Sequence, residues 1–145
     1  MRRVAARDLH HVGIAVADLA AAVERWRSVL GAEVEAEEEV PAQGVRAVAL
    51  RSGSGRIELL SPLAADTPVG RFLERRGDGM HHVAFSVDDL AAELTLLRAR
   101  GATLIDEQPR QGLYGPVAFI HPETVGGVLV ELVGRQGPER AKEAQ

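Results

Sequence analysis

The chain has 145 residues, of which 46% are hydrophobic and 26% charged, a composition typical of one folded domain rather than of a disordered chain. Its net charge of −4, together with the lack of an Arg stripe interleaved with aromatic residues, argues against a nucleic-acid-binding protein. No apolar run approaches the roughly 20 residues that cross a bilayer, and the first residues lack the apolar block of a signal peptide, so we expect a cytoplasmic protein without a membrane partner.

The first half of the chain predicts one strand, one helix and three further strands. A buried strand at 12–16 is followed by Asp18, a preferred helix N-cap residue, and then by an Ala-rich amphipathic pattern that ends at Gly31. Three strand-like runs follow at 33–39, 45–50 and 56–60, and the Gly-rich turn 52–55 joins the last two.

The second half repeats this order after a linker at 61–79. Within the linker, Thr67 and Pro68 are typical of the start of a short helix that ends before Gly77. We expect the polar residues 135–145 to form a disordered tail. Between linker and tail the sequence predicts a strand at 83–87, a helix capped by Asp89 that ends at Gly101, and strands at 103–107, 117–120 and 127–133.

The two halves are also related by sequence. An offset of 71 residues aligns 10–29 with 81–100, with nine identities over twenty positions. A period of about 70 residues in two copies is too long for a solenoid, so we predict one α+β domain over 1–145, built from two tandem βαβββ modules at 8–60 and 80–134. The sheets of the two modules would face each other, and equivalent positions would converge on a cleft at a pseudo-two-fold axis.

Four of the five histidines form two pairs at equivalent positions of the modules, 10–11 and 81–82. Side chains alternate between the two faces of a strand, so only one member of each pair can face the cleft. His11 and His82 share their faces with small residues, whereas His10 and His81 share theirs with larger, core-type residues. The sequence therefore predicts that His11 and His82 line the cleft.

Glu58 and Glu131 occupy equivalent positions within apolar strands, where an unpaired carboxylate is costly. Because the chain has no cysteine, a metal site must use imidazole, carboxylate or water ligands. Two imidazoles and two carboxylates suit an octahedral divalent ion with open water positions, with Co²⁺ or Mn²⁺ favoured and Ni²⁺, Mg²⁺, Zn²⁺ or Fe²⁺ as alternatives. The fifth histidine, His121, precedes Pro122 in a turn, where we expect a structural hydrogen bond.

The segments LHHVGIAVADL, GMHHVAFSVDDL and GGVLVEL, together with DEQPR and FIHP, resemble the methylmalonyl-CoA epimerase family of the vicinal oxygen chelate superfamily over about residues 9–134. The resemblance implies the glyoxalase fold, a homodimer, and a divalent metal held by His11, Glu58, His82 and Glu131. It also implies interconversion of (R)- and (S)-methylmalonyl-CoA by loss and return of the C2 proton through a metal-stabilised enolate, with Glu131 as the catalytic base.

At one position this chain differs from some members of the family. Where some members carry a second catalytic Glu, two residues after the QGV motif, this chain has Ala47. Glu58 itself or a metal-bound water is then the candidate for proton transfer on the opposite face. Arg110 and the loop 112–115 are the candidates for recognition of the CoA moiety.

Three other functions of the same fold are alternatives. A glyoxalase I-type lactoylglutathione lyase shares the fold, the metal ligands and the enediolate chemistry. An extradiol dioxygenase needs two His and one Glu around Fe²⁺, and a fourth carboxylate ligand speaks against it. A metal-free module that sequesters drugs has a cleft lined by aromatic residues, which make up 3% of this chain.

Overall fold

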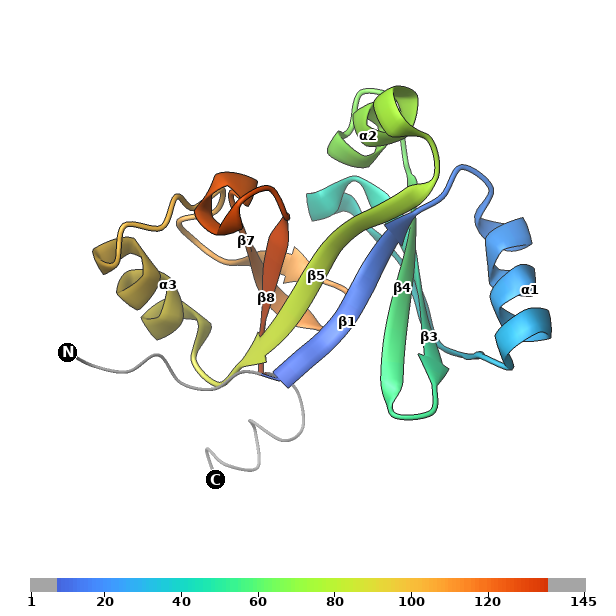
Figure 1. Ribbon diagram of the computed structural model, residues 1–145, viewed down its shortest axis with the longest axis horizontal. Helices are drawn as coiled ribbons and strands as arrows, with labels where there is room; N and C mark the ends of the chain where they lie inside the picture. The colour runs from blue at the N-terminus through green and yellow to red at the C-terminus, as the bar shows by residue number, and fades with distance from the viewer. Residues whose placement is uncertain (1–7, 136–145) are drawn as a thin grey trace.

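The structure, a computed structural model, describes residues 8–135, and within them a mixed sheet runs in the strand order β2-β3-β4-β1-β5-β8-β7-β6 (Figure 1). No helix in this part of the chain is long and apolar enough to cross a membrane. The strands are β1 Asp8–Ala15, β2 Glu33–Val40, β3 Val45–Ser52, β4 Gly55–Pro62, β5 Gly79–Val87, β6 Arg110–Gly112, β7 Gly115–Ile120 and β8 Val130–Gly134; the helices are α1 Leu19–Leu30, α2 Pro68–Arg76 and α3 Leu90–Ala99.

The strand order shows the internal duplication. β1, α1 and β2 to β4 form one βαβββ unit, and β5, α3 and β6 to β8 form the other. β1 pairs antiparallel with β5 at the centre, while β4 lies parallel to β1 and β8 parallel to β5. The prediction of two tandem modules is confirmed, but they share one continuous sheet through the β1–β5 pair, which Figure 1 shows side by side, instead of forming two separate sheets.

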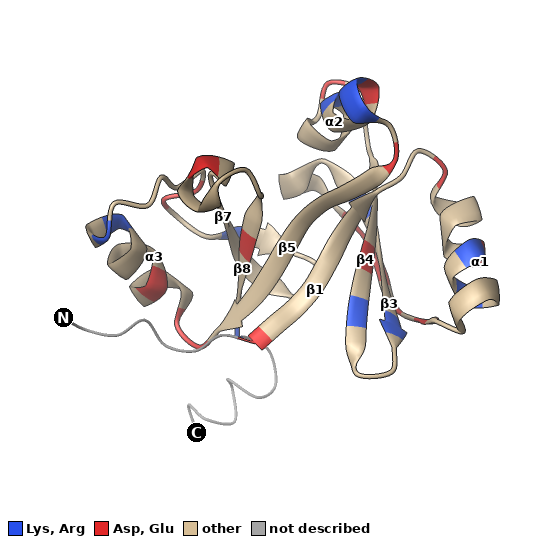
Figure 2. Ribbon diagram, in the orientation of Figure 1, with Lys and Arg blue, Asp and Glu red and all other residues tan. Residues whose placement is uncertain are grey.

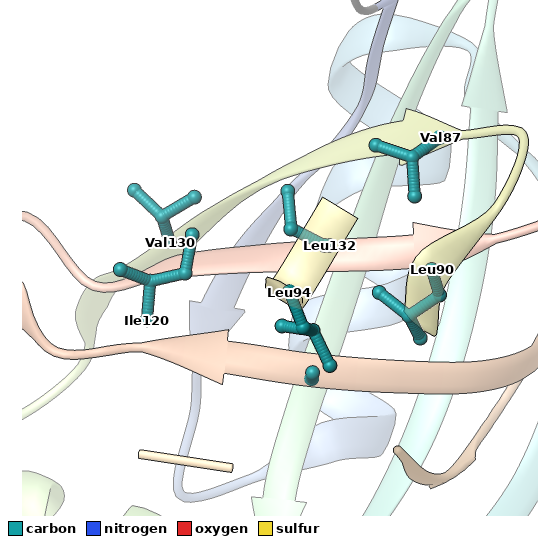
Figure 3. Packing of buried hydrophobic residues seen from close by; sticks show 7 residues of the cluster. Val87, Leu90, Leu94, Ile120, Val130 and Leu132 are labelled. Carbon is teal, nitrogen blue, oxygen red and sulfur yellow. The ribbon is translucent and has the colours of Figure 1, made fainter. Parts of the chain in front are cut away.

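Both long helices begin at the predicted caps and pack on their own module. The Asp18 side chain accepts a hydrogen bond from the backbone N–H of Ala21, and that of Asp89 accepts one from Ala92, each at 3.0 Å. Capping of this kind satisfies backbone donors that the first turn leaves without partners. α3 buries Leu90 and Leu94 against residues of β7 and β8; Figure 3 shows this cluster, which includes Val87, Ile120, Val130 and Leu132.

The prediction of a strand at 103–107 is wrong. In its place the chain makes one isolated bridge, Leu104 with Ile120, and the short strand β6 lies further along at Arg110–Gly112. The Asp106 carboxylate accepts from the backbone N–H of Phe119 at 2.9 Å, so this N–H does not pair with the backbone of 103–107. β8 begins at Val130 instead of residue 127, and Gly127 before it has a φ of 120°, outside the strand region. The tail predicted at 135–145 lies, after Arg135, outside the described residues.

The sheet curls until its two ends meet. Tyr114, in the β6–β7 connection, donates to Oε2 of Glu35 on β2 at 2.6 Å, and Arg110 on β6 donates to the backbone oxygen of Ala42 at 3.1 Å. The linker contains α2 as predicted, and its Val69 is buried in a cluster with residues of β1, β3 and β4. The curl and the helix together enclose a concave face of the sheet.

Candidate metal centre

The four residues predicted to form a site come from four adjacent strands in the middle of the sheet, β4, β1, β5 and β8. Gly13 on β1 pairs with Glu58 on one side and with His82 on the other. Ala84 on β5 pairs likewise with His11 and with Glu131. The strand register therefore brings together all four predicted side chains, two from each module. Figure 2 shows the two acidic positions as red segments on β4 and β8, flanking β1 and β5.

These four side chains are buried and very close together. Their relative exposure is 2% for each histidine and for Glu131, and 4% for Glu58. Nε2 of His11 lies 3.0 Å from Nε2 of His82 and 3.0 Å from Oε1 of Glu131, and Nε2 of His82 lies 3.1 Å from the same oxygen. Oε2 of Glu58 is 3.5 Å from Nε2 of His11. One ligand atom from each residue falls within 4.8 Å of all the others.

The arrangement fits a divalent cation. Oε1 of Glu131 is buried, and among the described residues no donor is aligned for a hydrogen bond with it, although two imidazole nitrogens are near. Adjacent ligands at right angles around an ion with bonds of about 2.1 Å are about 3 Å apart, which is the spacing of these three atoms. Two buried carboxylates without a cation would also be costly. The donor set thus suits a hard or borderline ion with six-fold coordination.

The ionisation of the site follows from burial and mutual contact. Burial raises the pKa of Glu131, but its contacts with His11 and His82 outweigh burial and lower that pKa to about 2. Burial lowers the pKa of His11, but the contact with Glu131 and the charge of Glu58 outweigh it and raise that pKa. Burial is the main reason why the pKa of Glu58 is raised. Glu131 is therefore an ionised carboxylate at neutral pH, able to bind a cation or to accept a proton.

His10 and His81 contact the two ligand histidines, a role that was not predicted from the sequence. Nδ1 of His10 lies 2.7 Å from Nδ1 of His11, and Nδ1 of His81 lies 3.0 Å from Nδ1 of His82. Burial, as the largest cause, lowers the pKa of both outer histidines to about 4, so both are neutral at pH 7. A neutral imidazole can accept the Nδ1–H of a histidine whose Nε2 binds a metal, which fixes the orientation of the ligand. The doubling of each histidine was the signal for this pairing.

Three other residues that the sequence singled out lie outside the group of four: Ala47, Arg110 and His121. Ala47 is 1% exposed and packs in an apolar cluster of β1, β3 and β4, so no carboxylate occupies that position. Arg110 lines a cavity of about 170 Å³ that also contains His82 and Phe119. His121 accepts from the backbone N–H of Glu123 at 3.1 Å and so caps the following 3₁₀ turn, the structural hydrogen bond expected of it.

The chain is similar to known proteins over most of its length. The model of the glyoxalase/bleomycin resistance protein/dioxygenase superfamily matches residues 10–119. The ethylmalonyl-CoA/methylmalonyl-CoA epimerase of Cereibacter sphaeroides is 41% identical over 127 residues, which cover 86% of this chain and 95% of that protein. The crystal structure of methylmalonyl-CoA epimerase from Mycobacterium tuberculosis has a TM-score of 0.87 at 39% identity, covering 92% of this chain and 91% of its own. A methylmalonyl-CoA epimerase solved with methylmalonyl-CoA and NH₄⁺ has a TM-score of 0.85 at 37% identity, covering 90% and 96%.

Proposed function

The chain belongs to the glyoxalase/bleomycin resistance protein/dioxygenase superfamily, and we propose that it is a methylmalonyl-CoA epimerase, an isomerase that interconverts the (R) and (S) forms at C2. The observation that carries the proposal is the buried group of two histidines and two glutamates that joins the two modules. The epimerases to which the chain is similar, one of them solved with methylmalonyl-CoA, support an acyl-CoA substrate.

The chemical problem is the weak acidity of the C2 proton, which lies between a thioester and a carboxylate. His11, Glu58, His82 and Glu131 would hold a divalent ion, with Co²⁺ or Mn²⁺ as the favoured ions. When bound, such an ion supplies Lewis-acid stabilisation of the negative charge that develops on the thioester oxygen. The burial of the four ligands strengthens every charge interaction inside the site, because little water is present to screen it.

Proton transfer is assigned to the carboxylates of this chain. Glu131 is the base that removes the C2 proton, because its ionised carboxylate lies within the group of ligands and can accept a proton there. Ala47 supplies no second carboxylate, and Glu58 is the other carboxylate of the group. Glu58 is therefore our candidate for proton transfer on the opposite face of C2. The homodimer and the cytoplasmic location expected from the sequence stay predictions.

The proposal is tested by exchange of the C2 proton of methylmalonyl-CoA with deuterated solvent, followed by NMR with and without a chelator. We expect exchange that is lost on chelation and restored by adding Co²⁺ or Mn²⁺. The same preparations are given methylglyoxal and glutathione, the substrates of a glyoxalase I-type enzyme. Absence of metal-dependent exchange, or a faster reaction with the glutathione adduct, would overturn the epimerase assignment.

A further inference from the structure

A second cavity opens beside the one that contains the metal ligand His82. We propose that this cavity, of about 370 Å³ between α2 and the segment 121–129, binds the phosphate groups of the acyl-CoA through Arg71, Arg75 and Arg76. The identity of the ligand rests on the proposed function, whereas the placement rests on the cavities and their charges.

The two cavities adjoin each other. Four residues line both of them: Pro68, His81, Ile105 and Leu129. His82, one of the four residues of the metal centre, lines the inner cavity, and residues of α2 line the outer one. A thioester group at the metal centre would therefore have a path along Ile105 and Leu129 toward α2. These side chains are apolar, as suits the long, uncharged pantetheine arm of CoA.

The charged side chains that line the outer cavity are basic. Its lining includes three arginines and no Asp or Glu, and Figure 2 shows the arginines of α2 in blue at the edge of the molecule. Arg71 donates to the backbone oxygen of Asp66, and the guanidinium of Arg76 lies 5.4 Å from the centre of the Phe72 ring. Arg75 has no ion pair or hydrogen bond with any residue that the structure describes. None of the three is paired with a carboxylate in that part of the chain, so all three are available to an anion.

His121 also lines the outer cavity, and its Nδ1 lies 3.9 Å from a carboxylate oxygen of Glu123. The same Nδ1 accepts from the backbone N–H of Glu123, so in the neutral imidazole the proton lies on Nε2, which is left to donate. CoA carries a diphosphate and a separate phosphate on its ribose, and several phosphates need several donors. Three guanidinium groups and an imidazole N–H form a site of that kind.

Arg110, the candidate named from the sequence, is engaged elsewhere. It contacts the carboxylate of Asp106 and donates to the backbone oxygen of Ala42. The bond to Ala42 joins the two ends of the sheet, and the carboxylate of Asp106 neutralises the guanidinium. The arginines of α2 are the better candidates, because no carboxylate of the described residues neutralises their charges.

The test compares two substrates and two pairs of arginine variants. The variant Arg75→Gln/Arg76→Gln removes two charges of the cavity, and Arg25→Gln/Arg27→Gln removes two exposed charges on α1 as a matched control. Each protein is assayed with methylmalonyl-CoA and with methylmalonyl-pantetheine, which lacks the nucleotide and its phosphates. Binding of adenosine 3′,5′-bisphosphate to each protein is measured by calorimetry, which does not depend on turnover.

We expect the α2 variant to raise KM for methylmalonyl-CoA by about tenfold or more, with kcat and the kinetics of the pantetheine substrate unchanged. Binding of the bisphosphate should be lost in the same variant and kept in the α1 control. Equal KM values in all three proteins would overturn the inference and leave the epimerase proposal standing. Loss of bisphosphate binding in the α2 variant, in a protein without epimerase activity, would support the cavity and reject the function.

Discussion

Gly13 and His82 face each other across the β1–β5 pair, and a Cβ atom on Gly13 would lie 2.0 Å from Cε1 of the His82 ring. The imidazole therefore occupies the space that any other residue at position 13 would fill. Gly13 also pairs with Glu58 on β4, so this one glycine lies between two ligands of the candidate metal centre. The missing side chain is thus part of the site.

Gly13→Ala should displace the His82 ring and weaken metal binding by about 10–100-fold, the range found when the support of a ligand is lost. Metal affinity is measured by titration with Mn²⁺ or Co²⁺, and folding by circular dichroism. Gly79→Ala is the control, because Gly79 lies on β5, the strand of His82, and a Cβ there meets no atom within 4 Å. Equal metal affinity in both variants would contradict the role given to Gly13.

Glu131→Gln tests the role of Glu131 as base separately from its role as metal ligand. An amide oxygen can still bind a metal but cannot accept the C2 proton. We expect epimerisation to fall by about 10²–10⁴-fold, the contribution of general base catalysis. The metal content, measured by atomic emission, should remain close to that of the unmodified protein. Near-normal turnover would remove Glu131 from the role of base.

Glu58→Gln tests the second proton transfer in the same way. The variant should still exchange the C2 proton of one epimer through Glu131, while conversion of that epimer into the other slows by at least about tenfold. Exchange is followed by NMR and conversion by chiral analysis of the products. Unchanged conversion would assign the return of the proton to water or to Glu131 itself.

His10→Phe and His81→Phe keep a ring in place but remove the nitrogen that faces each ligand histidine. Both substitutions should weaken metal binding by about 10–100-fold, as expected for residues that orient metal ligands. His121→Phe is the control, because His121 contacts the backbone of a turn and no metal ligand. Metal affinity equal to that of the control would show that the outer histidines do not orient the ligands.

The contribution of Glu35 to the stability of the fold should depend on pH. Its hydrogen bond with Arg56, the largest cause, lowers the pKa of Glu35 from 4.5 to about 2. A carboxylate with a lowered pKa in the folded state stabilises the fold above the unfolded value, and this contribution is lost as the pH falls through the folded value. The stability difference between the unmodified protein and Glu35→Gln should therefore be full above about pH 5 and shrink toward pH 2.

Urea unfolding at several pH values between 2 and 7 measures this difference. Glu38→Gln is the matched control, because Glu38 is exposed on the same strand and forms no ion pair with any described residue. A difference for Glu35→Gln that stays constant with pH would contradict the prediction.

Much of the fold was predictable because the sequence contains the same module twice. Nine identities in twenty positions fix the same strand and helix in both halves, and alternation along the strands selects His11 and His82 over their neighbours. The carboxylates were found through the repeat as well, since Glu58 and Glu131 occupy matching places in matching strands. Symmetry thus supplied information that one copy of the module lacks.

The misses concern contacts between segments far apart in sequence. Asp106 binds the backbone of Phe119, which no local pattern reveals, and so the strand expected at 103–107 does not form. The bond from Tyr114 to Glu35 joins residues 79 positions apart and closes the curled sheet. The pairing of His10 with His11 was also missed, because alternation on a strand suggested opposite faces.

The division of the ligands between the modules links metal supply to folding. Two of the four come from residues 8–60 and two from 80–134, so a bound ion would tie the halves together. An ion that binds only the folded chain stabilises it by about 4 kcal/mol at a thousandfold excess over Kd. The supply of the ion would then set how long the folded chain persists, as well as how fast it turns over its substrate.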